Sequence, residues 1–506
     1  MPEQKNEAIR DIEDTTNKLD DDNALIVWWD SGDDPRNPYN WPAWRKWTNC
    51  GLISVMTFLS PLASSMFAPG VSQALDEFGT TGSRAVVSSL VVSVYVMGFA
   101  AGPMALAPLS EMYGRVPVYH AANVGFVAFT VGCALAPNLG GLVVLRFLCG
   151  VCGSAPITIG GGSIADMVVQ EHRGSVMSGF SMGPLIGPVI GPIAGGFLTD
   201  AMGWRWVFWV LAMVVGVTGL AMLALLRESY APVILHRMAV ERRSQTGNPL
   251  FRSKLDMGLS PADFFKRGIV RPAAMLRHSP IIIITAFYLA INYGFLYLFY
   301  TTFPSVFTGQ YGFSTSIVGL SYLGQGIGSI IGLVAFSLTS DKYMKKRAAA
   351  ARVSAGAEPC SGSGHSGSNA MKPEYRLPYL PAGALLVPVG LFIYGWAAHY
   401  RLHWIAPIIG TAISGVGIIV VYMAITLYLI DTFTIYAASA LAANTVIRSI
   451  AGALLPLAGL PMFNNLGLGW GNSLLAFIAL LLVPVAFILM RYSEALREKF
   501  PTKGVV

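Results

Sequence analysis

Twelve apolar stretches, each long enough to cross a lipid bilayer, constrain this chain more than any other feature. A helix needs about 20 mostly apolar residues to cross about 30 Å of hydrocarbon. Each stretch must be helical, because a lone strand leaves its backbone groups unbonded in lipid. The stretches are 47–68, 86–107, 116–136, 141–165, 174–199, 204–226, 280–303, 316–339, 378–398, 403–430, 438–463 and 470–491. The predicted fold class is an all-α membrane protein whose twelve transmembrane helices form two pseudo-symmetric bundles of six.

The polar segments between these stretches predict the division of the chain. The predicted parts are an N-terminal tail (1–46), a first bundle (47–226), an interdomain loop (227–279), a second bundle (280–491) and a C-terminal tail (492–506). The interdomain loop is expected to contain short amphipathic helices. A second cytoplasmic loop, 340–377, is expected to be flexible because its central part is rich in Gly and Ser.

The distribution of basic residues predicts the orientation. With a cytoplasmic N-terminus, 29 of the 34 Lys and Arg residues lie on the cytoplasmic side, three lie outside and two lie within spans. Cytoplasmic loops of membrane proteins carry such an excess, so both termini are expected in the cytoplasm. The net charge of +7 then belongs to the cytoplasmic face and needs no nucleic-acid partner.

A short connection, Pro108–Arg115, joins the second and third spans. Gly114 permits a tight turn, and Glu111 and Arg115 are close enough in sequence to pair. An alternative is an ordinary short hairpin whose charges reach the membrane surface. The stretch resembles the G-x-x-x-D-R-x-G-R motif of the major facilitator superfamily, in the version of fungal twelve-span drug:proton antiporters, although Ala107 and Met112 depart from it. The resemblance implies that Glu111, Gly114 and Arg115 are gating residues, with a weaker echo at Asp341.

The fifth predicted span contains a regular series of small residues. Gly187, Gly191 and Gly195 recur every fourth residue and share a helix face that lets another backbone approach closely. Pro192 lacks a backbone donor and should bend the helix. A generic packing face is the alternative. With Gly196, the pattern G-x-x-x-G-P-x-x-G-G matches the antiporter motif of the same family, and this resemblance implies export.

Two arginines lie within predicted spans. A guanidinium in hydrocarbon costs at least about 2.5 kcal/mol, so Arg146 should face a cavity or a partner, unless it extends to the outer surface. R-x-x-x-G in the fourth span resembles the superfamily's second motif, which implies a role in proton coupling. Arg448 is either structural or substrate-facing.

A proton carrier is hard to identify in the sequence. No Asp or Glu lies near the middle of a span, so either a span-end carboxylate such as Asp166 enters the cavity or coupling is weak or absent. Cys149 and Cys152 form a CxxC without a second CxxC or a nearby His, so no metal site is expected. No cofactor is expected either.

Amphipathic aromatic and amide side chains supply candidates for a substrate cavity. Such rings can stack on a flat organic molecule, although helix packing or an interfacial aromatic belt would explain them as well. The candidates are Tyr288, Asn292, Tyr293, Tyr297, Tyr322, Gln325, Tyr422, Asn444 and Arg448.

These observations favour a monomeric secondary transporter of the plasma membrane. The resemblance implies proton-driven export of small amphipathic organic molecules (drugs, toxins or secondary metabolites) by alternating access. Uptake or facilitated transport of a polyamine or nutrient is the alternative. A membrane-embedded enzyme is less favoured, because HxxxD, HExxH and GxxxxGK[ST] patterns are absent. The N-terminal DDPRNPYNWP (33–42) and ESYAP (228–232) segments also resemble fungal members of the group.

Overall fold

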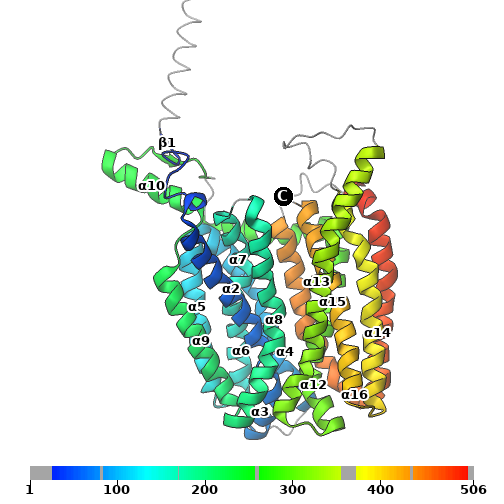
Figure 1. The fold of residues 1–506 in the computed structure, drawn as a ribbon. Helices are drawn as coiled ribbons and strands as arrows, with labels where there is room; N and C mark the ends of the chain where they lie inside the picture. Colours follow the sequence, from blue (N-terminus) through cyan, green and yellow to red (C-terminus); the bar gives the residue numbers. More distant parts are fainter. Residues whose placement is uncertain are drawn as a thin grey trace, which may run out of the picture.

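The computed structural model describes residues 25–79, 84–168, 170–256, 261–354, 372–433 and 437–499. Long helices run roughly side by side in two adjoining groups (Figure 1). The first group contains α2 (Ala43–Ser65), η2 (Ala68–Gly70), α3 (Val71–Glu77), α4 (Arg84–Tyr113), α5 (Arg115–Ala134), α6 (Leu139–Gly153), α7 (Ala155–Met167), α8 (Gln170–Met202) and α9 (Trp204–Leu225). The second contains α12 (Pro280–Tyr311), α13 (Thr315–Ser354), η4 (Pro373–Tyr379), α14 (Leu380–His399), α15 (Ile405–Phe433) and α16 (Ala437–Lys499).

The last span-forming segment resolves the number of transmembrane helices. Eleven helical segments of the described residues are long and apolar enough to cross a membrane, and the eleventh runs from Ala440 to Lys499. A helix of that length would measure about 90 Å, about three times the hydrocarbon thickness. Gly467 interrupts it with φ 76° and ψ 166°, which divides it into two spans. The predicted twelve-helix membrane fold is confirmed.

Several helices extend further than the hydropathy predicted, and two of them, α4 and α13, bear on the site. α4 continues to Tyr113, so Glu111 lies in its last turn and not in a loop. α13 continues to Ser354, which makes 340–354 helical where a flexible loop was predicted. Hydropathy marks only the part in lipid, whereas the Lys-, Arg- and Ala-rich sequence beyond it still favours a helix. Residues 355–371 of the predicted loop lie outside the described range.

The buried core follows the two groups of helices. One large apolar cluster draws on residues between Trp41 and Leu226. Two further clusters draw mainly on residues between Met275 and Leu489. Val96 of α4 belongs to one of the latter clusters, so the two groups pack directly against each other inside the membrane.

One end of the helical bundles carries a small additional layer, seen beyond the helix ends in Figure 1. It contains β1 (Ile26–Val27), η1 (Pro38–Asn40), α10 (Ala231–Thr246), β2 (Arg252–Ser253) and α11 (Pro261–His278). β1 pairs with β2 in parallel, Ile26 opposite Arg252. Residues 25–42, here called the N-terminal strap, are thereby joined to the segment between the two bundles.

Candidate functional site

An arginine–aspartate cluster lies at the end of the first bundle where α4, α5 and α7 meet. Gly114 ends α4 with φ 101°, a conformation that side-chain-bearing residues rarely adopt. The Nε of Arg115 lies 3.2 Å from Oδ2 of Asp166 at the end of α7. Its Nη1 donates to Oγ of Ser110 at 2.8 Å. Because Gly114 separates the helices, Glu111 and Arg115 do not share a helix face, and Arg115 forms its ion pair with Asp166.

Glu228, which we had not predicted as a site residue, completes this cluster. The backbone N–H groups of Arg115 and Val116 donate to its two carboxylate oxygens at 3.0 and 3.1 Å. An acid at this place stabilises the N-terminus of α5. The ring of Tyr230 lies 4.5 Å from the Arg115 guanidinium, and burial raises the pKa of Tyr230 to about 12. The resemblance of the ESYAP segment was the only sequence signal for this contact.

The second bundle repeats the arrangement. The Nε of Arg376 lies 3.2 Å from Oδ2 of Asp431 at the end of α15. Its Nη1 donates to Oγ of Ser340 in α13 at 3.1 Å. The weaker sequence echo had pointed to Asp341, whose side chain lies outside the described part. Arg376 was missed because 340–377 was treated as a flexible loop.

Removing the Arg115 charge should therefore impair the predicted transport without unfolding the chain. We expect Arg115→Gln to lower transport activity at least tenfold, since its partners hold the ends of α4 and α7 together, and Asp166→Asn to do the same. The double variant should be no worse than either single one, because both changes remove one interaction. Substrate transport by cells, normalised to the amount of folded protein, measures this. Arg347→Gln, at an exposed arginine on α13, is the control, and additive losses would contradict the pairing.

The N-terminal strap has its own anchors. Val27 is buried against Leu235 and Met238 of α10. The Asp34 carboxylate accepts hydrogen bonds from the backbone N–H of Arg36 at 2.9 Å and from its Nε at 3.1 Å. These contacts with Arg36 lower the pKa of Asp34 to about 2, so the turn keeps its negative charge at neutral pH.

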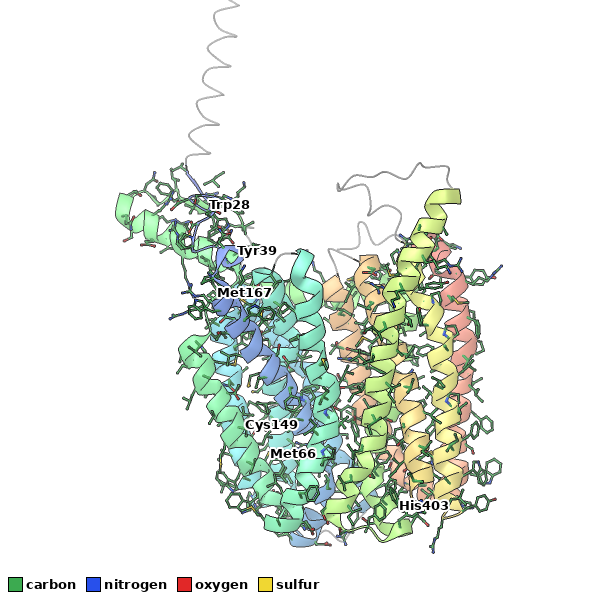
Figure 2. The ribbon with its side chains drawn as sticks, in the orientation of Figure 1. Trp28, Tyr39, Met66, Cys149, Met167 and His403 are labelled. Carbon is green, nitrogen blue, oxygen red and sulfur yellow. The ribbon has the colours of Figure 1, made fainter. Side chains whose placement is uncertain are left out.

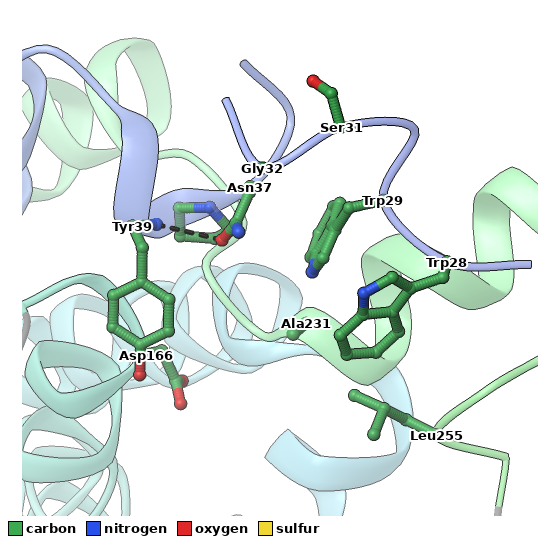
Figure 3. A pocket seen from close by; sticks show the side chains of 10 residues that line it. Trp28, Trp29, Ser31, Gly32, Asn37, Tyr39, Asp166, Ala231 and Leu255 are labelled. Atoms are coloured by element: carbon green, nitrogen blue, oxygen red, sulfur yellow. Dashed lines mark hydrogen bonds between the residues drawn. The ribbon is translucent and has the colours of Figure 1, made fainter. Parts of the chain in front are cut away.

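The strap ends directly above the Arg115 cluster. The hydroxyl of Tyr39 donates to the carbonyl of Ala165 at 3.0 Å, next to Asp166. Figure 3 shows the pocket between them, with Tyr39 and Asp166 on one side and the rings of Trp28 and Trp29 on the other. The first tail, the interdomain segment and the Arg115 cluster are thus one connected structure.

Arg146 lies deep in the first bundle. It is one helical turn from Cys149, which is labelled in Figure 2. It is only 1% exposed, so it does not extend to the outer surface. Its Nη1 and Nη2 donate to the carbonyls of Ala63 and Ser64, both at 2.9 Å. These carbonyls belong to the last turn of α2, where a helix lacks its own donors and carries partial negative charge. Arg146 therefore caps α2 from inside the bundle.

The glycine series in α8 packs against α2. A Cβ on Gly187 would lie 2.7 Å from the carbonyl oxygen of Phe58, and one on Gly195 would lie 1.8 Å from that of Met66. Pro192 deprives the carbonyl of Pro188 of its helical donor, and Oγ of Ser65 replaces that donor at 3.2 Å. The close contact between α8 and α2 thus requires glycines on α8. The proline in α8 requires a hydroxyl donor on α2.

The same motif also reaches the other bundle. A Cβ on Gly196 would lie 2.8 Å from the carbonyl oxygen of Thr315 in α13. A Cβ on Gly319 of α13 would lie 2.7 Å from the carbonyl oxygen of Pro192. Near this end, Ser316 donates to Asp200 at 2.9 Å. The seam between the bundles is therefore built from small residues at the end opposite to the Arg115 cluster.

Two of the predicted cavity candidates, Tyr293 and Tyr297, form a series of rings on α12 with Tyr300. Together with Tyr322 of α13, these rings are here called the aromatic wall. Ring centroids lie 5.0 Å apart for Tyr293 and Tyr297, and 5.5 Å apart for Tyr297 and Tyr300. Tyr322 of α13 continues the series 5.7 Å from Tyr300. The hydroxyls of Tyr297 and Ser64 lie 3.0 Å apart and link the two bundles.

Other candidates lie apart from this wall. Tyr288 is buried in a different apolar cluster, and its carbonyl accepts a hydrogen bond from Nδ2 of Asn292 at 3.1 Å. Gln325 is fully buried beside Gly415 of α15, and neither of its amide atoms has a hydrogen-bond partner. The guanidinium of Arg448 lies 5.0 Å from the ring of Tyr293 and 5.3 Å from that of Tyr422. Asn444 is buried one turn away.

Comparison with known proteins identifies this architecture. A family model described as "Major Facilitator Superfamily" matches residues 53–456. The chain belongs to the major facilitator superfamily. It is 53% identical over 475 residues to the MFS-type transporter tndD of Aspergillus flavipes, covering 94% of this chain and 86% of the relative. It is 47% identical over 473 residues to the efflux pump radE of Floropilus chiversii, covering 94% and 85%.

Solved structures agree with the superfamily fold. The xylose transporter XylE from E. coli, in a partially occluded inward-open conformation, superposes with a TM-score of 0.61 at 14% identity. The match covers 89% of this chain and 98% of that one. The family and fold predicted from the two motifs are confirmed, and this superfamily member is a multi-pass membrane transporter.

Proposed function

We propose that this chain exports small amphipathic organic molecules, such as drugs, toxins or secondary metabolites, by alternating access coupled to proton antiport. The observation that carries the proposal is the place of the G-x-x-x-G-P-x-x-G-G motif, which contacts α2 with one face and the opposite bundle with Gly196. The relative named as an efflux pump supports the outward direction.

The two ends of the bundles have different roles in this proposal. The two arginine clusters hold the cytoplasmic ends of each bundle as rigid units, while the small residues of α8 and α13 provide a surface on which the bundles rock. Cargo binds between them, near the aromatic wall on α12. We place the monomeric transporter in the plasma membrane with both termini in the cytoplasm.

Proton coupling is assigned to the Asp166–Arg115 pair, with Arg146 as a structural support. Protonation of Asp166 removes the negative partner of Arg115 and loosens the cytoplasmic end of α7. Arg146 already donates to backbone carbonyls of α2, and its guanidinium carries no proton in transport, because arginine keeps its proton at all physiological pH values.

Sealed vesicles containing the purified chain test the proposal. A proton gradient directed into the cytoplasmic compartment should drive loaded amphipathic dyes outward, and Asp166→Asn should abolish the response to the gradient. Efflux that does not depend on the proton gradient would indicate facilitated transport instead of proton antiport. Net accumulation of a polyamine or nutrient in the cytoplasmic compartment would instead establish uptake.

A further inference from the structure

Arg448 lies near the middle of the membrane and faces the protein interior. It is about a dozen residues from the start of α16, or about 17 Å along the helix axis. Ile450, two residues later, is exposed on the outside of the bundle, and two residues rotate a helix by about 200°. Arg448 therefore points away from the lipid, towards Tyr293 of α12 and Tyr422 of α15.

The surroundings of Arg448 differ from those of Arg146. Arg146 donates to carbonyls on two helices. The rings of Tyr293 and Tyr422 lie beside the Arg448 guanidinium, and the Tyr422 hydroxyl accepts a hydrogen bond from it, while its buried Nε has no hydrogen-bond partner. Among the described side chains, no carboxylate forms an ion pair with it. A guanidinium at this depth is costly without an anion, and the unpartnered Nε leaves a donor for one.

A second unpartnered polar side chain lies on the same helix face. Asn444 precedes Arg448 by four residues, which places both on one side of α16. Asn444 is 2% exposed, and neither its Nδ2 nor its Oδ1 has a partner. On the next turn of this face, a Cβ at Gly452 would contact Tyr293 and, at 3.4 Å, Val96 of the first bundle. The face thus meets the aromatic wall and the seam between the bundles.

We infer that the cargo is an organic anion whose acidic group binds Arg448 and Asn444 while its conjugated body rests on Tyr293 and Tyr297. This inference rests on the proposed transport function and specifies its substrate class: aromatic or conjugated carboxylates, enolates and phenolates. Guanidinium forks bind planar anionic groups through two parallel hydrogen bonds. A polyamine would meet a fixed positive charge here, with no mid-span carboxylate in the sequence to offset it.

Three naphthalene probes of similar shape test the inference. The full-length protein in detergent is titrated with 2-naphthoate, 2-naphthamide and 2-naphthylmethylammonium, and binding is measured by calorimetry. We expect naphthoate to bind at least tenfold more tightly than naphthamide. Arg448→Gln should remove that ratio while naphthamide binding persists, and Arg448→Lys should retain part of it, because a lysine keeps the charge without the fork.

Two further variants keep the test decisive if Arg448→Gln is unstable. Asn444→Ala should weaken naphthoate binding several-fold, and Arg401→Gln, at an exposed arginine, should leave the ratio unchanged. A wild type without preference for naphthoate, or a preference that survives in Arg448→Gln, would overturn the inference. Vesicles that bind naphthoate selectively but never move it would refute the proposed export and leave the anion site standing.

Discussion

The Gly195→Ala variant is expected to transport substrate at least tenfold more slowly than the wild type. Most of the purified variant should be recovered as aggregate. The added Cβ would lie 1.8 Å from the carbonyl oxygen of Met66, which is backbone and cannot rotate away. α2 and α8 would have to separate by more than an ångström along a contact that Gly187 and Gly191 share. Overpacking commonly costs about 1–3 kcal/mol and more where backbone is involved.

A matched control lies on the same helix. A Cβ at Gly179 of α8 would meet no atom within 4 Å, so Gly179→Ala should be neutral or stabilising by up to about 1 kcal/mol. Size-exclusion profiles and export assays of both variants make the comparison. Gly196→Ala adds a third arm: its Cβ would press on α13 of the other bundle, so it should fold and yet transport poorly. Equal behaviour of the Gly195 and Gly179 variants would refute this account of the motif.

The second large effect is expected from Arg146→Leu. The carbonyls of Ala63 and Ser64 would then lie in an apolar core without their donors, and each unsatisfied buried acceptor costs about 1–3 kcal/mol. A loss of about 3 kcal/mol in the free energy of unfolding corresponds to a Tm lower by about 6–12 °C for a domain of the size of the first bundle. Intrinsic fluorescence of the purified protein during heating measures the shift.

Two other arginine variants control for charge and place. Arg146→Lys keeps the charge but not the two parallel donors, so its Tm should fall between those of wild type and Arg146→Leu. Arg448→Leu, in the other bundle, should change the Tm little, because that guanidinium donates to no carbonyl like those of α2. A wild-type Tm for Arg146→Leu would show that α2 does not depend on the cap.

The sequence was sufficient to predict the helices and their grouping because the bilayer imposes one rule on every span. A window of apolar residues must be helical and about 20 residues long, whatever it packs against. The rule stops at the membrane surface, and this is why the C-terminal ends of α4 and α13 were placed too early. The interruption at Gly467 falls between the predicted spans 438–463 and 470–491, because the loss of apolar residues there is visible in the sequence.

The partners of individual side chains were harder to predict than the motifs that contain them. Sequence spacing suggested Glu111 for Arg115, but Asp166 and Glu228, which lie far along the chain, provide the contacts. Arg146 and Arg448 looked equivalent as intramembrane cations. Only the positions of neighbouring helices separate a guanidinium that caps α2 from one flanked by tyrosine rings, and no local pattern encodes those positions.

The hydrogen bond from Ser65 to the carbonyl of Pro188 makes two distant positions interdependent. Pro192 has no N–H to donate to that carbonyl, and the Ser65 hydroxyl on α2 donates to it instead. In a descendant that exchanged the proline for another residue, the helix would supply its own donor, and selection on the serine would relax. The serine and the proline should therefore be gained and lost together as lineages of these carriers diverge.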